Sequence, residues 1–242
     1  MDSIRNIKTL ELSKYINSFR ELLIGKGFFE HSLYSTTDHK IENTPYFKLT
    51  DGLFLRYGTE PDVWEIGQDF DKFFWIGSLF RNEKNLTEIH NYEFKVLDYY
   101  IKNGSMDDVP GIFCQLLKKA EENIQLKRKL SKFNFQHISY KDLVKDKLKK
   151  IQRCWLIVTD YPKEESFYDC SPDIELTTKF EIFFYNKDKL IELASGGLVG
   201  RNINSYMYIK NENDFVNKKV FDRRFMGLGF GLERLIYLYF MR

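Results

Sequence analysis

The chain contains 242 residues, 43% of them hydrophobic and 30% charged, which is the balance of a globular protein with a sizeable buried core. Its formal net charge of +2 is too small to indicate a nucleic-acid partner, and no run approaches the roughly 20 apolar residues of a membrane helix. Cys114, Cys154 and Cys170 are dispersed like free thiols of a reducing compartment, and no apolar signal segment is present. We therefore expect one compact domain over 1–242, in the cytoplasm and not in a membrane.

Two helices and four extended segments are predicted in the first part of the chain. Apolar residues at helical spacing predict an amphipathic helix over 12–26, which Gly25 and Gly27 end. A shorter helix is expected around 61–69. The strands are expected at 28–34, 53–57, 73–80 and 92–101. Because a polar loop joins the last two strands, they predict a long antiparallel hairpin.

Three helices and three strands are predicted in the second part. The helices are expected over 109–130, 140–150 and 232–241, the last of them following a glycine-rich turn. The strands are expected at 155–159, 180–185 and 190–194, of which the last two form a second hairpin. Successive hairpins without a regular βαβ alternation predict an α+β fold, in which helices pack against an antiparallel sheet. No Gly-x-Gly-x-x-Gly or P-loop sequence is present, so a nucleotide would bind by another route.

Charged and aromatic residues gather at the mouth of the first hairpin. Arg81 and Glu83 lie two residues apart on an extended segment, so both side chains project to one face. Such a pair alone is more often a solvated strand end. The return strand, however, begins with His90, Glu93 and Phe94, and this combination favours a binding site.

Two glutamates lie on the second hairpin. If residues 186–189 form its loop, Phe183 faces Glu192, and Glu181 lies diagonal to Glu192 on the same face. Two carboxylates so placed repel each other unless a cation lies between them, and oxygen ligands of this kind suit Mg²⁺ that bridges phosphates. The alternative is two surface glutamates, because a register slip of one residue would separate them.

The last feature is the sequence Gly227-Leu-Gly229-Phe-Gly231-Leu-Glu-Arg234. Alternate glycines let a backbone approach a ligand closely. Arg234 lies in the first turn of the following helix, where free N–H groups already favour an anion. The segment therefore predicts either a phosphate site or a tight turn that happens to be basic.

These segments together resemble the class II aminoacyl-tRNA synthetases, especially the lysine, aspartate and asparagine subgroup. Phe80-Arg81-Asn82-Glu83 with His90-Asn91-Tyr92-Glu93-Phe94 is similar to motif 2 of that family, and 227–235 is similar to motif 3. The segment 10–34 lies where motif 1 would be, and 55–60, 158–164, 180–181 and 191–194 match in order and approximate spacing. The resemblance implies a six-stranded antiparallel sheet flanked by helices, with ATP and Mg²⁺ as cofactors. It also implies activation of an amino acid as its adenylate.

The resemblance assigns roles in catalysis and ATP binding. Arg81 would bind the α-phosphate and stabilise the transition state, and Arg234 would cover one face of adenine and reach the γ-phosphate. Glu83 would accept a hydrogen bond from the adenine amino group, while Phe94 stacks on the ring. His90 and Asn91 complete the predicted ATP site, with His90 near the β- and γ-phosphates.

The remaining roles concern the metal and the amino acid. Glu181 and Glu192 would hold Mg²⁺, and Glu60 would bind the α-ammonium group of the substrate. Four further positions would line the substrate pocket: Gly196, Gly197, Val199 and Arg201. Lysine-activating relatives have a glutamate at the position of Val199, so lysine is disfavoured as the substrate. Because of Arg201, an amino acid with an acidic or amide side chain remains a candidate substrate. An apolar or unusual amino acid is the alternative.

Partners are less constrained by the resemblance. A homodimer is expected from the family, although 28–34 lacks the proline of the motif 1 interface. We expect no anticodon-binding domain, which favours transfer of the amino acid to ammonia, a protein, a small molecule or a carrier. The alternatives are charging of a tRNA or minihelix through its acceptor end, and an inactive regulatory paralogue. The lysine-rich stretch 118–150 is expected to form solvated helix faces rather than an RNA surface.

Overall fold

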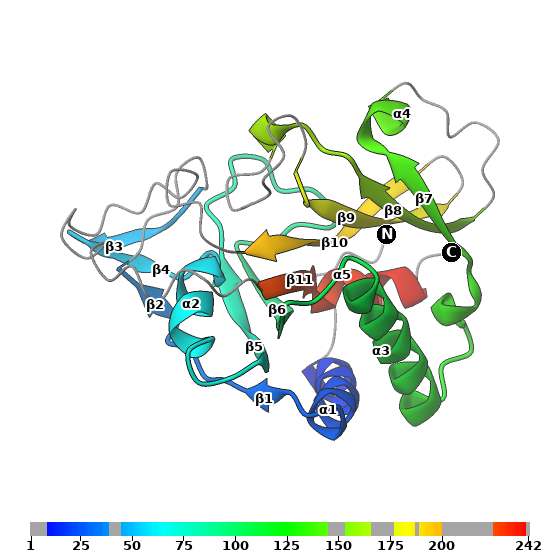
Figure 1. Cartoon of the computed structure of the whole chain (residues 1–242), viewed down its shortest axis with the longest axis horizontal. Coiled ribbons are helices and arrows are strands. Elements are labelled where there is room, and N and C mark those ends of the chain that lie inside the picture. The colour runs from blue at the N-terminus through cyan, green and yellow to red at the C-terminus, as the bar shows by residue number, and fades with distance from the viewer. Residues whose placement is uncertain are drawn as a thin grey trace.

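The computed structural model describes residues 9–38, 45–144, 153–165, 177–186, 189–199 and 225–240. Its main sheet contains the strands β1 (Phe29–Glu30), β5 (Lys72–Phe80), β6 (Glu93–Lys102), β7 (Phe135–Ser139), β8 (Cys154–Thr159), β9 (Phe180–Asn186), β10 (Lys189–Val199) and β11 (Phe225–Gly231). They lie in the order β1-β5-β6-β11-β10-β9-β8-β7 (Figure 1). Strands that are far apart in the chain, such as β6 and β11, are therefore neighbours at the centre.

The expectation of a six-stranded antiparallel sheet was wrong at the two edges, because the sheet that the described residues form has eight strands and is mixed. All pairs between β5 and β8 are antiparallel, but β1 pairs with β5, and β7 with β8, in parallel. Parallel neighbours need a crossover connection, and the helix α4 (Tyr140–Val144) lies in the one between β7 and β8. The polar residues of β7, Phe135–Ser139, gave no strand signal in the sequence.

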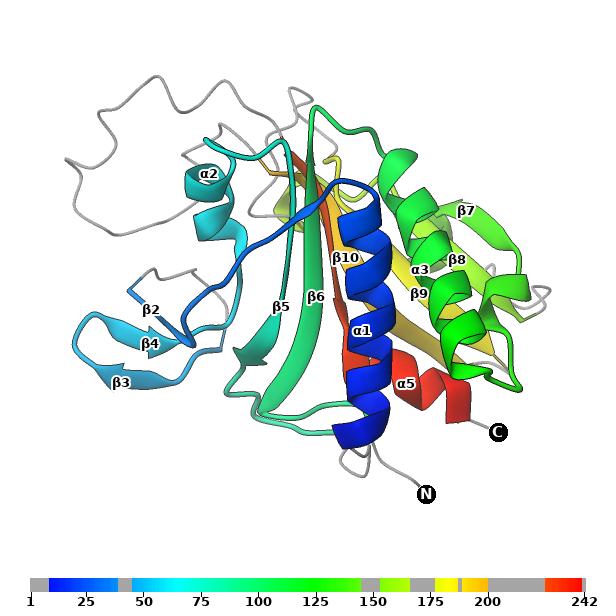
Figure 2. The same ribbon diagram turned by 90° about the horizontal axis from the view of Figure 1, so that it is seen from below.

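Three helices cover one face of this sheet: α1 (Thr9–Gly25), α3 (Asp108–Ile124) and α5 (Leu232–Phe240) (Figure 2). The core between helices and sheet is rich in aromatic side chains. Phe113 of α3 makes edge-to-face contacts with Trp155 of β8 and Phe230 of β11, at centroid distances of 5.5 and 5.4 Å. Aromatic residues bury large areas, so this packing accounts for much of the attachment of the helices.

The helix predicted over 109–130 ends early, at Ile124. Gln125 adopts a left-handed backbone conformation with φ of 56°, which stops the α-helix. The following residues form tertiary contacts instead, because Arg128 donates to the carbonyl of Leu238 and Lys129 donates to that of Glu121. A short 3₁₀ turn, Leu130–Lys132, then leads into β7.

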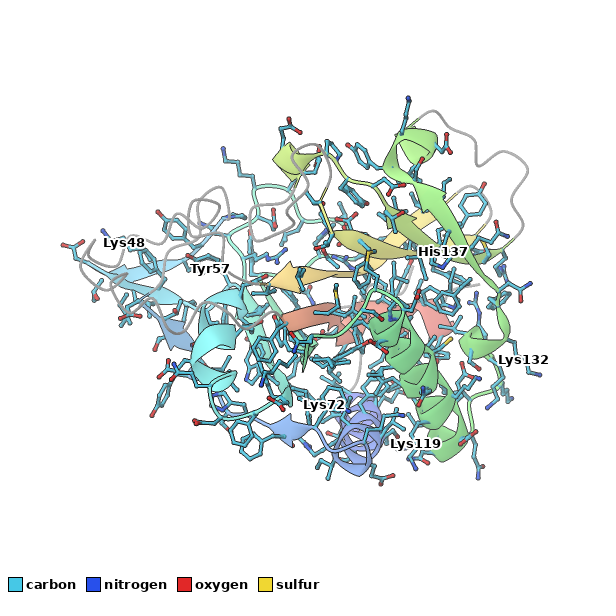
Figure 3. The ribbon with its side chains drawn as sticks, in the orientation of Figure 1. Lys48, Tyr57, Lys72, Lys119, Lys132 and His137 are labelled. Carbon is cyan, nitrogen blue, oxygen red and sulfur yellow. The ribbon has the colours of Figure 1, made fainter. Side chains whose placement is uncertain are left out.

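A smaller sheet lies beside the main one, in the order β2-β4-β3, with β2 at Thr36–Thr37, β3 at Lys48–Thr50 and β4 at Leu53–Leu55. Lys48 lies toward its outer end and Tyr57 toward the main sheet (Figure 3). The predicted helix around 61–69 is a 3₁₀ turn at Glu60–Asp62, followed by α2 (Val63–Ile66). The buried Arg56 connects these parts, because it pairs with Asp62 at 2.5 Å and donates to the carbonyl of Tyr34 at 2.6 Å.

The glycine-rich segment before the last helix is a central strand rather than a turn. β11 pairs with β6 on one side and with β10 on the other over Phe225–Gly231. Its alternation of apolar residues with glycine has the period of two that a strand requires. Within the described ranges of the lysine-rich stretch, Lys118 is exposed on α3, whereas the exposed Lys127 and Lys132 lie beyond the end of that helix.

Candidate active site

A cavity of about 470 Å³ opens on the face of the sheet opposite α1, α3 and α5. Side chains alternate along a strand, so Leu97 and Tyr99 of β6 face the helices whereas Asp98 and Tyr100 line the cavity. All the described residues predicted for the site line this one cavity: Glu60, Arg81, Glu83, His90, Asn91, Phe94, Glu181, Glu192, Gly196, Gly197, Val199 and Arg234. Arg201, the remaining one, lies outside the described residues.

The β5–β6 hairpin positions the first group. Phe80 pairs with Glu93 at its end, and the backbone N–H of Arg81 donates to the carbonyl of Tyr92 at 2.9 Å. The Arg81 guanidinium lies 5.5 Å from the centre of the Phe94 ring, which is cation–π distance. A positive group and an aromatic face are therefore presented together to the cavity.

His90 belongs to the loop of the same hairpin. Its Nδ1 atom lies 2.7 Å from the hydroxyl of Thr87, which orients the ring. Burial, and then the positive charges of Arg234 and Arg81, lower the pKa of His90 below its usual value. The imidazole is therefore held in its neutral form, beside two arginines that favour an anionic ligand.

The acidic pair lies on the β9–β10 hairpin with the predicted register. Leu190 faces Tyr185 and Glu192 faces Phe183. A bulge then follows between Glu192 and Ala194, so that Ser195 faces Glu181. Both carboxylates remain on the cavity side.

Charged groups of both signs surround the Glu192 carboxylate. Burial in the cavity wall and the neighbouring carboxylate of Glu181 raise the pKa of Glu192, while Arg234, Arg81 and Lys179 oppose the shift. Arg234 donates to the backbone carbonyl of Glu192 at 2.8 Å, and its guanidinium lies 4.0 Å from the Glu192 carboxylate. The side chain of Glu192 is still 47% exposed, so its carboxylate can reach a ligand.

The floor of the cavity holds two further carboxylates, and only Glu60 was predicted. The Oε2 atom of Glu60 is buried and has no hydrogen-bond partner among the residues that the structure describes, and burial raises the pKa of this group. Asp98 is 6% exposed and accepts a hydrogen bond from Thr59 at 2.5 Å. Burial raises the pKa of Asp98 to about 7. A single charged residue in the apolar run Val96–Ile101 was the signal that could have found it.

Two glycines of β11 make room for this floor. A Cβ atom on Gly229 would overlap a carboxylate oxygen of Asp98, and one on Gly227 would overlap the ring of Tyr100. The Tyr100 hydroxyl lies 3.0 Å from that of Thr59, which also donates to Asp98. Asp98, Tyr100 and Thr59 therefore form one hydrogen-bonded cluster. Glycine is thus required where side chains of β6 lean across β11.

The residues present fit Mg²⁺ bound together with phosphates. Among the described residues there is no group of three or more His, Cys, Asp or Glu side chains that could hold a metal alone. Mg²⁺ prefers one or two carboxylates, several waters and the phosphates of a substrate, and Glu181 with Glu192 supplies such a partial set. Arg81 and Arg234 line the same cavity and would supply positive charge for such phosphates.

The helix-backed sheet, the hairpin arginine and the acidic pair define a domain of the class II synthetase type. A comparison with protein families matches residues 8–208 to the tRNA synthetases class II (D, K and N). Because this match covers most of the chain, the protein belongs to that family.

One curated relative and several solved structures are similar to the chain. The lysine–tRNA ligase of Wigglesworthia glossinidia brevipalpis is 30% identical over 146 residues, which are 56% of this chain and 29% of the ligase. The asparaginyl-tRNA synthetase of Pyrococcus horikoshii, complexed with asparaginyl-adenylate, has a TM-score of 0.75 at 18% identity, over 95% of this chain and 64% of that one.

The asparaginyl-tRNA synthetase of Entamoeba histolytica has a TM-score of 0.75 at 16% identity, over 95% of this chain and 63% of that one. At such identities the likeness to both solved synthetases shows the fold. The chain spans less than two thirds of the length of each of these proteins. None of the helices in the described ranges has the length and apolarity that a membrane crossing requires.

Proposed function

We propose that this domain activates an amino acid with ATP, forming an aminoacyl adenylate and releasing pyrophosphate. The observation that carries the proposal is that Arg81, Arg234 and the pair Glu181/Glu192 line one cavity, although they come from three separate parts of the chain. Membership of the class II family supports the same reaction. No side chain acts as a nucleophile, because the substrate carboxylate attacks the α-phosphate directly.

Arg81 and Arg234 are the proposed catalytic residues. Arg81 binds the α-phosphate and neutralises the charge that develops there as the carboxylate attacks. Preorganised positive charge of this kind is usually a large part of catalysis, and alignment of the two reactants supplies another part. Arg234 reaches the γ-phosphate from the first turn of α5.

The base of ATP is proposed to stack on Phe94, whose ring already lies near the Arg81 guanidinium. Glu83 accepts from the adenine amino group, and Asn91 completes the wall of the ATP site. His90, held neutral beside two arginines, donates to the β- or γ-phosphate. Glu181 and Glu192 would hold Mg²⁺, which would supply positive charge to offset part of the phosphate charge.

The amino acid is proposed to bind on the cavity floor, between Gly196, Gly197 and Val199. The buried, unpartnered Oε2 atom of Glu60 accepts from its α-ammonium group. Val199 cannot pair with a lysine ammonium group at the position where lysine-activating relatives have a glutamate. In its ionised form Asp98 repels an acidic side chain and accepts a hydrogen bond from an amide one. An amide side chain therefore fits the floor better than an acid.

The acceptor of the activated amino acid is proposed to be ammonia, a protein, a small molecule or a carrier. The family name favours a second candidate, aminoacylation of a tRNA or minihelix through its acceptor end. Transfer of a labelled amino acid to a minihelix would separate the two. The domain is further proposed to act in the cytoplasm as a homodimer, in line with the exposed Phe29, which belongs to the edge strand β1 and stacks on Phe70.

The test is ATP–pyrophosphate exchange with Mg²⁺, screened over the proteinogenic amino acids and their close analogues. We expect exchange that depends on one acid, and a loss of about 10²–10³-fold in the variant Arg81→Ala. The matched control is Arg153→Ala, which removes an arginine that donates to the Asn186 side chain away from the cavity. An inactive regulatory paralogue would show no exchange with any acid, and equal rates for Arg81→Ala and the wild type would exclude the proposed role.

A further inference from the structure

Both oxygen atoms of the Glu181 carboxylate already have a protein partner. The ammonium group of Lys179 lies 3.0 Å from Oε1, and the hydroxyl of Tyr161 donates to Oε2 at 2.6 Å. Glu181 is therefore held by two donors in the protein alone, although the proposed function makes it a ligand of Mg²⁺. Neither Lys179 nor Tyr161 had a predicted role.

Lys179 is fixed in place by more than its ion pair. Its ammonium group donates to the backbone carbonyl of Glu165 at 3.0 Å and lies 4.4 Å from the centre of the Tyr161 ring. Its side chain is only 13% exposed, whereas most lysine side chains are solvated. These contacts come from two separate segments, residues 161–165 and the start of β9. The ammonium group is thus a fixed part of the cavity wall.

The charge of Lys179 offsets the acidic pair. Glu181 and Glu192 share one cavity, where two carboxylates without a cation repel each other. Lys179 provides one positive charge in direct contact with Glu181. A divalent cation that approaches Glu181 must compete with this ammonium group for Oε1, and the attraction of the pair for the cation is reduced by one charge.

We propose that Lys179 is a positioning residue that acts through Glu181 as a built-in counter-ion, so that a divalent cation binds tightly only together with the phosphates of ATP. The inference rests on the proposed function, because it assumes that Glu181 and Glu192 bind a metal. The phosphates supply the negative charge that Lys179 withdraws from the pair. The site is thereby protected from binding a free metal ion before the nucleotide arrives.

The test measures binding of Mn²⁺ to the whole protein by the electron paramagnetic resonance signal of free Mn²⁺, with and without a non-hydrolysable ATP analogue. We expect weak binding to the wild type without nucleotide and tight binding with it, beyond the Mn²⁺ that the same concentration of analogue binds in the absence of protein. The variant Lys179→Met should bind Mn²⁺ without nucleotide about tenfold more tightly, as expected for the loss of one close charge in a partly solvated site. Lys179→Arg keeps the charge and should behave like the wild type.

The matched control is Lys102→Met, which removes a lysine that pairs with Asp71 outside the cavity. It changes the net charge equally and should leave Mn²⁺ binding unchanged. Lys179→Gln, which still offers a donor to the Glu165 carbonyl, carries the same test if Lys179→Met does not fold. Unchanged or weaker binding of Mn²⁺ in the folded Lys179 variants would overturn this inference alone. A wild type that binds no Mn²⁺ even with the ATP analogue would overturn the proposed function.

Discussion

The two faces of the central sheet are built from the same strands by opposite rules. On β6, Leu97 and Tyr99 pack under the helices, and the Tyr99 hydroxyl donates to the carbonyl of Val109. Their neighbours Asp98 and Tyr100 face the cavity together with the glycines of β11. The helix face is filled by packed aromatic side chains, whereas the cavity face carries charged side chains around an open cavity.

The difference shows which local rules the cavity breaks. A buried carboxylate with a raised pKa and a buried oxygen without a partner both cost free energy in the folded protein. Such groups are typical of sites that complete their contacts only when a ligand binds. The helix face has to supply the stability that the cavity face lacks, and substitutions on the two faces should therefore fail in different ways.

The largest effect on stability is expected on the helix face. Phe113 is fully buried between Trp155 and Phe230, so Phe113→Ala leaves a cavity that this packed layer cannot close. We expect a loss of about 3–5 kcal/mol in the free energy of unfolding, measured by urea denaturation. Phe240→Ala is the control, because Phe240 lies at the exposed end of α5 and should change stability little. Similar losses for both variants would contradict the division between the faces.

The cavity face was the harder one to predict from the sequence, although most of its polar residues were found. Hairpin counting gave the Leu190–Tyr185 and Glu192–Phe183 pairs, because the pleat alone sets which residues share a face. It could not give the bulge after Glu192, which shifts the pairing of the following residues by one position. Only the family resemblance connected this hairpin with the motif 2 hairpin.

The elements that sequence reasoning missed lack a local hydrophobic signal. β11 was taken for a turn because three of its residues are glycines, and their role is visible only beside Asp98 and Tyr100 on the next strand. Lys179 and Tyr161 belong to polar segments whose contact with Glu181 is a tertiary one. Secondary-structure propensity describes single segments. It therefore cannot indicate which side chains from distant segments will form an ion pair or a hydrogen bond.

The pH dependence of stability should distinguish the cavity face from the helix face, because Asp98 belongs to the cavity face. Burial raises the pKa of Asp98 to about 7 in the folded protein, above its ordinary value of 3.8. A raised pKa favours the protonated folded form, so this contribution to stability is complete below about pH 4 and is lost as the pH rises to about 7. Relative to Asp98→Asn, the wild type should lose about 2–4 kcal/mol over that range.

This prediction is checked by urea denaturation of both proteins from pH 4 to pH 8. The control is Asp71→Asn, which removes a carboxylate that is 75% exposed and pairs with Lys102. Because solvent screens such a pair, we expect a much smaller change with pH. A stability difference between the wild type and Asp98→Asn that stays constant with pH would show that Asp98 is not a strained group of the cavity floor.

The smallest stability effect, and the one most specific to the cavity face, is expected for Gly229→Ala. The new Cβ atom would overlap the end of the Asp98 side chain, which can move only by giving up its hydrogen bond to Thr59. We expect a loss of about 1–2 kcal/mol, together with a clear fall in ATP–pyrophosphate exchange, because the floor of the site shifts. Gly111→Ala is the control, since its Cβ atom would meet no atom within 4 Å and Gly111 lies on α3, away from the cavity. If both variants keep the exchange rate of the wild type, Gly229 serves the strand alone and not the cavity.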